Sequence, residues 1–417
     1  MRWRIEPGRR CLALLAALVI LAASAGADSC GESERSGATI PGSQLVIYTS
    51  LPLQGVPRQR ALDVLAAERL ALEQAGRKVG DFQVRLVALD SASAKTGRQD
   101  PGRTSANARA AAKNATSIAY IGELDPVGSA VSAPILNRAR ILQVSPGDTA
   151  VGLTRSEGAG KDEPDKYYPT DERNFARVVP ADHIQAQAVT TYMKEQGVKR
   201  SYVVNDRSLY GQGIADQVAE KARDQDVTVA ANEAINPQRV DPRALAARVA
   251  SSGSDALFYG GEMESQVVEL WKALLARSPQ VKLFGPASLA ETGFAKAIGP
   301  AGRNTFLTSP AFDPALYPPA GQEFFKDFRD AYGREPGAEA IYGFEAMSAV
   351  LEALKSAGEK ANNRGAVIEA FFATKNRESA LGTYSIDDNG DTTLTDYGAY
   401  RVEGGSLVFD KVLKAQT

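Results

Sequence analysis

At 417 residues, 44% of them hydrophobic and 24% charged, the chain has the composition of a soluble protein with room for two or three domains. Its 48 basic and 50 acidic residues give a net charge of −2, without the basic excess of a nucleic-acid-binding protein. The single histidine, His183, argues against a zinc site or a catalytic triad, and no cysteine follows Cys30 to form an internal disulfide or a thiolate metal site.

The first 30 residues have the pattern of an export signal. Arginines at positions 2, 4, 9 and 10 precede an apolar run over residues 12–23 that is short for a membrane-spanning helix, and small residues follow it. An uncleaved anchor helix is the alternative. Cys30 ends the small-residue stretch, in a placement that resembles the lipobox of bacterial lipoproteins. The sequence therefore predicts a signal peptide over residues 1–30, lipidation of Cys30 and a polar tether over residues 31–42.

From residue 45 onward, short apolar runs alternate with segments of helical periodicity. The first series predicts strands at 45–48, 82–89, 118–121 and 141–144 and helices over 60–74, 105–113 and 129–138. Pro134 lies inside the last of these helices, so we expect a kink or an early break there. The alternation predicts a parallel sheet with helices on both faces.

A polar stretch over residues 152–173 separates this series from a second one. The second series predicts strands at 201–205, 227–231, 256–259, 281–284 and 305–308 and helices over 182–196, 214–224, 242–252 and 265–277. Three helical patterns follow over 321–332, 339–358 and 365–374 and indicate a return to the first domain. The tail predicts antiparallel strands at 382–386, 397–402 and 406–409 with a turn over residues 387–391.

Two loops of the first series, over residues 123–128 and 145–149, follow neighbouring parallel strands. The carboxyl ends of strands in open α/β sheets are where ligands bind. The hydroxyls of Ser129, Ser145 and Thr149, with backbone N–H groups and a helix N-terminus, suit a small anion such as a carboxylate. The alternative is that these are ordinary turn and capping residues.

Several local patterns carry a family resemblance through their order and spacing. They are AYIGELDPVGSAVSAPILN with ILQVSPGDT, ARVVPADHIQAQA, VVNDRSLYGQG, DALFYGG and GTYSIDDNGD. Together they resemble the type I periplasmic-binding-protein fold, and within it the branched-chain amino-acid (Leu/Ile/Val-binding) substrate-binding proteins of ABC transporters, in a lipoprotein form. The resemblance covers residue 45 to the C-terminus.

The resemblance implies an α/β fold of two Rossmann-like lobes, a Venus flytrap that closes by a hinge over a ligand in the cleft. Three crossing strands would join the lobes near residues 178–180, 309–310 and 381–382. The first lobe would comprise residues 43–178 and 311–381, and the second 179–310 and 382–417.

The resemblance also implies a set of ligand-binding residues. The Asp125–Ser129 and Ser145–Thr149 loops would hold an α-carboxylate, with the backbone at Gly147 near the amino group. Tyr210 would close over the ligand from the second lobe, and Glu262 would reach it there. The expected ligand-binding residues are Leu53, Asp125, Pro126, Ser129, Ser145, Gly147, Thr149, Tyr210 and Glu262.

The chain departs from the family pattern at two positions. The family's serine in the first loop aligns near Pro126, so a hydroxyl there would come from Ser129 or be absent. Amino-acid binders commonly place an acid that pairs the ammonium after the Gly-Pro of the next strand, but Gly285-Pro286 is followed by Ala287 and Ser288. A buried ammonium needs a partner, and Asp125, Asp148 and Glu262 are the candidates that the sequence leaves open.

Other motifs favour structural explanations. Gly211-Gln212-Gly213 lacks the full dinucleotide-binding pattern and indicates a close strand–helix turn. The Asp387–Asp391 stretch lacks the ligand spacing of a calcium loop, and Glu262 with Glu264 indicates two solvated charges.

These expectations combine into an exported lipoprotein on the outer face of the cell membrane, which binds an amino acid, amide or small carboxylate and delivers it to an ABC permease. No catalytic residue, cofactor, metal or nucleic-acid partner is expected. Two alternatives stay open. One is a sensor of the same fold coupled to a membrane receptor, and the other is an extracytoplasmic α/β hydrolase, which the lack of a G-x-S-x-G motif disfavours.

Overall fold

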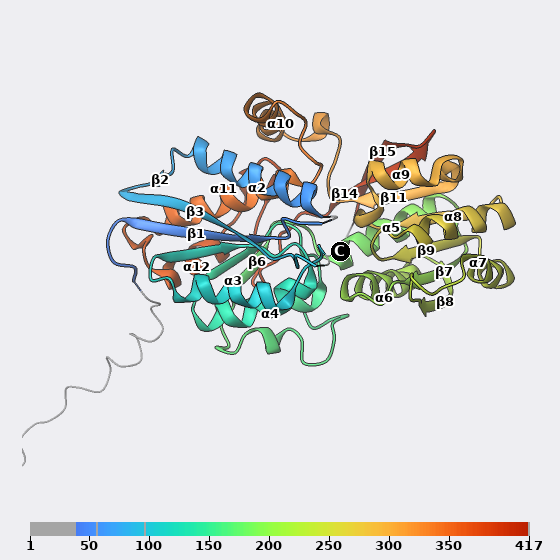
Figure 1. Ribbon diagram of the computed structural model, residues 1–417, viewed down its shortest axis with the longest axis horizontal. Helices are drawn as coiled ribbons and strands as arrows, with labels where there is room; N and C mark the ends of the chain where they lie inside the picture. Colours follow the sequence, from blue (N-terminus) through green and yellow to red (C-terminus); the bar gives the residue numbers. More distant parts are fainter. Residues whose placement is uncertain (1–38, 56, 96, 416–417) are drawn as a thin grey trace, which may run out of the picture.

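The computed structural model describes residues 39–55, 57–95 and 97–415, which form two α/β lobes side by side (Figure 1). The expected signal peptide, Cys30 and most of the expected tether lie outside the described residues. None of the described helices is both long and apolar enough to cross a membrane.

The first lobe is built on a six-stranded sheet in the order β2-β3-β1-β4-β5-β6. Its strands are β1 (Gln44–Leu51), β2 (Lys78–Val79), β3 (Phe82–Asp90), β4 (Ser117–Ile121), β5 (Leu142–Ser145) and β6 (Phe175–Arg177). All neighbours pair in parallel except β2 with β3. Strands β1 and β4 are buried almost throughout, as expected of parallel strands covered on both faces.

Helices from two distant parts of the chain cover this sheet. They are α2 (Arg58–Gln74), α3 (Pro101–Lys113) and α4 (Pro126–Arg138), with α10 (Pro319–Tyr332), α11 (Ala340–Ala357) and α12 (Arg364–Phe372). Helix α11 packs along α2 and α12, and one hydrophobic core combines β1, β4 and β5 with these helices (Figure 1). The three late helical patterns thus return to the first lobe.

The second lobe carries a seven-stranded sheet in the order β15-β14-β11-β10-β9-β7-β8. Its strands are β7 (Arg200–Asn205), β8 (Thr228–Ala234), β9 (Ala256–Gly260), β10 (Lys282–Gly285), β11 (Thr305–Ser309), β14 (Asp396–Glu403) and β15 (Ser406–Lys414). Its helices are α5 (Asp182–Glu195), α6 (Leu209–Asp224), α7 (Pro242–Ser251), α8 (Ser265–Arg277) and α9 (Thr292–Ile298). Strands β7 to β11 are parallel, whereas β14 and β15 pair antiparallel at one edge.

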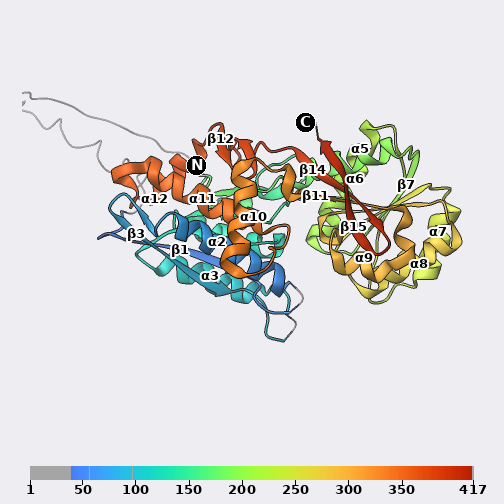
Figure 2. The same cartoon turned by 90° about the horizontal axis from the view of Figure 1, so that it is seen from above.

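Three segments run between the lobes, after β6, after β11 and before β14 (Figure 2). The last of these follows the two-stranded sheet of β12 (Arg377–Ser379) and β13 (Gly382–Tyr384). Tyr384 and Ile386 still belong to the core of the first lobe. We therefore place the third crossing between Asp391 and Asp396, later than the expected position at residues 381–382.

Two local expectations were wrong. Helix α3 begins at Pro101 rather than at residue 105, because the Asp100 carboxylate caps it by accepting from the Arg103 N–H. Helix α4 continues through Pro134 to Arg138, so the early break considered there does not occur. Buried packing of Ala133 and Leu136 on either side of the proline outweighs the hydrogen bond lost there.

Candidate ligand-binding site

The loops at the carboxyl ends of the parallel strands approach one another between the lobes. Arg98, on the loop after β3, forms an ion pair with Glu264 at the start of α8. In the same region, Gln217 of α6 donates to the carbonyl of Gly158 in the polar insertion, at 3.1 Å. We call the region where these loops meet the lobe interface.

Arg60, near the start of α2, brings positive charge to the lobe interface. Its guanidinium forms an ion pair with Glu339. Burial lowers the pKa of Arg60, but the carboxylates of Glu339 and of Glu262 and Glu291 in the second lobe raise it overall. Loops after β1, β9 and β10 therefore lie within electrostatic reach of one another.

The start of α4 contributes Asp125, its N-cap residue, and Ser129, in its first turn. Asp125 caps α4 by accepting from the Gly128 N–H at 3.0 Å. The Ser129 side chain is fully buried, and its hydroxyl has no hydrogen-bond partner within the described part of the chain. Asp125 thus has a structural role, whereas Ser129 offers an unused polar atom.

The loop after β5 holds its shape through Ser145. The Ser145 hydroxyl donates to the Glu123 carbonyl at 2.7 Å and accepts the Gly147 and Asp148 N–H groups at 3.2 and 2.8 Å. It is thereby fully engaged inside the loop. A side chain at Gly147 would come within 3.0 Å of Leu124, so glycine lets the two loops pack closely.

Two buried carboxylates meet beside this loop. Asp148 accepts the Ala150 N–H through one oxygen, at 3.0 Å, and its Oδ2 has no partner among residues 39–55, 57–95 and 97–415. Asp182 is the first residue of α5 in the second lobe, and its N–H donates to the Thr149 carbonyl at 2.8 Å. Its Oδ1 also has no hydrogen-bond partner among these residues. Both residues are only 1% exposed.

Burial shapes the charge of both carboxyl groups. It raises the pKa of Asp148 to about 6, although the charge of Arg177 and the nearby Ser129 hydroxyl, which does not meet hydrogen-bond geometry with it, act against this rise. Burial also raises the pKa of Asp182 to about 7, and the negative charge of Asp148 adds to this rise. The Thr149 hydroxyl acts in the opposite direction and lowers the pKa. Because the charge of Asp148 acts on Asp182, and the Asp182 N–H bonds to the carbonyl of the residue after Asp148, the two carboxyls lie near each other where the lobes join.

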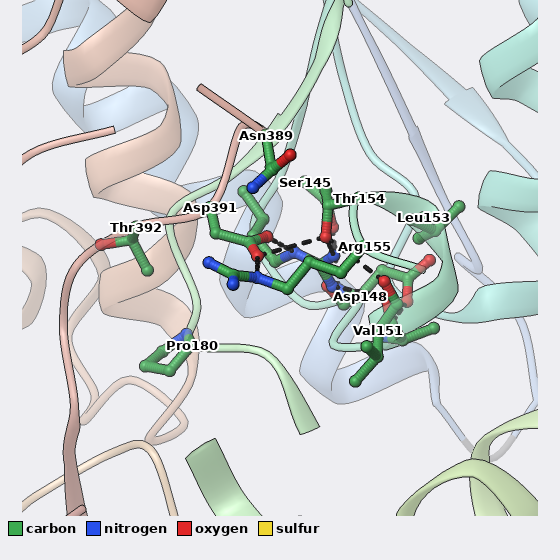
Figure 3. Close-up of polar contacts among 12 residues, drawn as sticks. Ser145, Asp148, Val151, Leu153, Thr154, Arg155, Pro180, Asn389, Asp391 and Thr392 are labelled. Carbon is green, nitrogen blue, oxygen red and sulfur yellow. Dashed lines mark hydrogen bonds and ion pairs between the residues drawn. The ribbon is translucent and has the colours of Figure 1, made fainter. Parts of the chain in front are cut away.

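A buried ion-pair network fixes the loop that carries Asp148. Arg177 of β6 is 0% exposed, donates through Nη1 to the carbonyls of Asp148 and Ala150, and donates through Nε to Asp391 at 2.8 Å. Asp391 also accepts from Thr154 and Arg155 at 3.2 and 2.8 Å, as Figure 3 shows. The Asp387–Asp391 turn, a turn as expected, is thereby joined to the loop by arginines.

The second lobe presents Tyr210 and Glu262. Asp206 ties their two loops together by accepting the N–H groups of Ser208 and Glu262 at 2.9 and 3.0 Å. Burial raises the pKa of the Tyr210 phenol well above its ordinary value, and the charges of Asp182 and Glu262 add to this effect. Tyr210 therefore lies close to the buried carboxyl site.

The structure brings most of the expected ligand-binding residues to the lobe interface, with different roles. Ser129, Thr149 and Tyr210 lie near the buried carboxyls, and Glu262 lies near Tyr210. Leu53 packs in a small hydrophobic cluster with Leu124, and Pro126 is the buried first residue of α4. Glu264, expected to be solvated, instead pairs with Arg98.

Sequence reasoning missed Arg60, Arg177 and Asp182. Arg177 and Asp182 both lie in the stretch ARVVPADHIQAQA, where charged residues within an apolar segment were the available signal. Among the residues that the structure describes, no group of three or more His, Cys, Asp or Glu side chains is placed to hold a metal ion.

Comparison with known proteins identifies the class to which this fold and interface belong. The sequence matches the family model for periplasmic binding proteins over residues 49–406, and the chain belongs to that family. Among solved structures, the leucine-binding protein LivK of Thermotoga maritima aligns with a TM-score of 0.74 at 22% identity, covering 89% of this chain and 99% of that one. The fold is therefore that of the type I periplasmic binding proteins.

Other similar proteins carry names that describe their ligands. A Rhodopseudomonas palustris solute-binding protein, solved with benzoate, aligns at 19% identity with a TM-score of 0.71, covering 90% of this chain and 98% of that one. Leu/Ile/Val-binding protein homolog 1 of Brucella melitensis is 28% identical over 49% of this chain and 53% of its own, so the match spans about half its length. The Leu/Ile/Val-binding protein BraC3 of Rhizobium johnstonii is 28% identical, and the match covers 68% of this chain and 73% of that protein.

Proposed function

We propose that this protein is the exported solute-binding lipoprotein of an ABC importer, and that it binds a small amino-acid-like, amide or carboxylate ligand at the lobe interface. On this proposal the lobes close over the ligand by a hinge, and the closed form is recognised by the permease. The protein performs no chemistry on the ligand. Its relatives support this reading because they are named as binding proteins.

One observation carries the proposal. Three polar atoms, Ser129 Oγ, Asp148 Oδ2 and Asp182 Oδ1, are buried without hydrogen-bond partners in the described chain, and they come from both lobes. Buried polar groups are nearly always paired, because an unpaired one costs roughly 1–3 kcal/mol. A bound solute would supply the missing partners, and it would do so only when both lobes are in place.

A thermal-shift screen of the soluble form, beginning after Cys30, tests the binding function. The panel comprises amino acids, amides, and aliphatic and aromatic carboxylates. A ligand at a hundred times its dissociation constant stabilises the folded protein by about 2.7 kcal/mol. Tyr210→Ala and Thr149→Ala should abolish the shift, and Thr228→Ala, on the exposed edge strand β8, should leave it unchanged. A folded protein that no compound stabilises would contradict the proposal.

The proposed membrane anchor has its own test. In the full chain, Cys30→Ser should move the protein from the membrane fraction to the soluble fraction. Cys11→Ser should leave it in the membrane fraction, because Cys11 lies within the apolar run of the export signal. Equal membrane retention of both variants would indicate an uncleaved anchor helix instead.

A further inference from the structure

We propose that the ligand carries a net positive charge, and that its ammonium group binds between the carboxylates of Asp148 and Asp182 and the hydroxyl of Ser129. This inference rests on the proposed solute-binding function and narrows it to one ligand class. It also names the groups that take the place of the acid missing after Gly285-Pro286.

The number of unpaired oxygens matches the hydrogen-bonding capacity of an ammonium group. Ser129 lies in α4, Asp148 in the loop after β5, and Asp182 in the first turn of α5. Each of the three side chains is at most 1% exposed, and each has one oxygen without a partner in the described part of the molecule. An ammonium has three N–H donors and no acceptor, so it can satisfy one oxygen of each residue.

The nearby cations are already engaged. Arg177 influences both carboxyls, but its Nε, Nη1 and Nη2 donate to Asp391, to backbone carbonyls and to Thr154 respectively. Arg155 pairs with Asp387 and Asp391 at 2.6 and 2.8 Å. Arg155 and Arg177 are thus paired with Asp387 and Asp391 of the turn over residues 387–391. Neither arginine forms an ion pair with Asp148 or Asp182.

The wider lobe interface is acidic as well. Asp125, Glu262 and Glu291 all contribute negative charge there, and the neighbouring Arg60 is paired with Glu339. A ligand with only a carboxylate would bring a further negative charge beside desolvated carboxyls, and a neutral amide would leave their charge unbalanced. A cation relieves both costs. A metal ion fits less well, since no three-ligand cluster occurs among the described residues.

Two exposed apolar side chains neighbour Tyr210 and Glu262 along the chain. Leu209 begins α6 next to Tyr210, Met263 follows Glu262 on the loop after β9, and they are 59% and 43% exposed. Large exposed hydrophobic side chains next to a polar site provide a contact for an aliphatic chain. We therefore choose aliphatic probes for the test.

Calorimetric titration with three compounds on one carbon skeleton tests the charge requirement. Leucine carries both groups, 3-methylbutylamine lacks its carboxylate, and 4-methylpentanoate lacks its ammonium. Lysine and putrescine are added as further cationic ligands. Benzoate is added as a further carboxylate, and 4-methylpentanamide as a neutral amide. We expect the amines to bind the soluble protein more tightly than leucine, and 4-methylpentanoate to bind weakest.

Two variants locate the site. Asp148→Asn and Asp182→Asn should each weaken amine binding by roughly 30-fold or more, because each removes one partner of a buried charge pair. Ser129→Ala removes an acceptor without changing the charge, and it should weaken binding less. Asp330→Asn, an exposed position on α10, is the matched control and should leave the affinity unchanged. The two aspartate variants should not lower the melting temperature of the ligand-free protein, because they remove uncompensated buried charge.

The possible results separate this inference from the proposed function. Tighter binding of 4-methylpentanoate or benzoate than of the amines would overturn the inference and leave the binding function standing. Amine binding that survives in both aspartate variants would overturn it as well. A folded protein that binds no compound of either panel would overturn both.

Discussion

At the scale of single residues, the first lobe buries a carboxyl group that forms no ion pair among the described residues. Glu68 of α2 is fully buried beneath β1, where one of its oxygens accepts from the Thr49 hydroxyl at 3.1 Å and the other has no partner in the described chain. Burial raises the pKa of Glu68 from 4.5 to about 8, although the Thr49 hydroxyl acts against this rise. The folded state therefore retains a proton that the unfolded chain releases.

This proton makes stability depend on pH. Because the folded-state pKa of Glu68 lies above its unfolded value, its neutral form is accommodated at low pH, and stability falls as the pH rises from about 4.5 to about 8. Glu68→Gln imitates the neutral acid and removes this dependence. We expect the variant and the wild type to unfold at similar urea concentrations at pH 4.5, and the variant to be more stable by about 1 kcal/mol or more at pH 8. A constant difference at all pH values would contradict this account.

At the scale of elements, the approach of a helix to a strand organises the second-lobe side of the lobe interface. Helix α6 begins at Leu209, where the Ser208 hydroxyl caps it by accepting the Gly211 N–H at 2.9 Å. A Cβ at Gly211 would lie 2.7 Å from the Gly260 carbonyl oxygen of β9. The close strand–helix turn expected from the Gly-Gln-Gly motif therefore exists, and glycine permits it because no side chain separates the two backbones.

The two glycines of this motif should respond oppositely to substitution. Gly211→Ala forces α6 away from β9 and should lower the free energy of unfolding by about 1–3 kcal/mol, as overpacking does. Gly213→Ala is the matched control, because a Cβ there meets nothing within 4 Å. It should raise the free energy of unfolding by about 0.5–1 kcal/mol through helix propensity. Urea unfolding measures both. Equal effects would mean that the close approach does not limit the packing.

At the scale of the whole molecule, the proposed hinge motion depends on the contacts that cross the lobe interface. The ion pair between Arg98 and Glu264 joins the lobes at the loops after β3 and β9. The Arg98 side chain is 64% exposed, so solvent screens the pair and its contribution is at most about 1 kcal/mol. Such a contact biases a balance between open and closed lobes without determining the fold.

Glu264→Gln should therefore shift the lobes toward the open form. We expect a larger radius of gyration for the ligand-free protein by small-angle X-ray scattering, and ligand affinity reduced by up to about fivefold, with unchanged stability to urea. Glu269→Gln is the control, because Glu269 pairs with Lys272 within the same helix α8. Identical scattering curves and affinities for the two variants would show that the pair has no part in closure.

The sequence predicted the order of elements far better than the contacts of the site. Strands such as β4 and helices such as α11 carry their own periodicity, so residues 118–121 and 339–358 indicated them closely. Short or irregular elements without such periodicity were missed, among them β2, β12 and α9. For the site, Thr149 and Tyr210 were named through a family resemblance, whereas Arg60 and Asp182 were not named at all.

By itself, the sequence determined the two βα series, the return of the chain to the first lobe and the membership of its family, because apolar periodicity and capping residues act between neighbours along the chain. Only the tertiary structure decided which charges meet. Arg177 pairs with Asp391 across 214 positions, and Asp148 lies beside Asp182 across a lobe crossing. Coulombic and hydrogen-bond energies depend on distance in space and on burial, and neither quantity is set by separation along the chain.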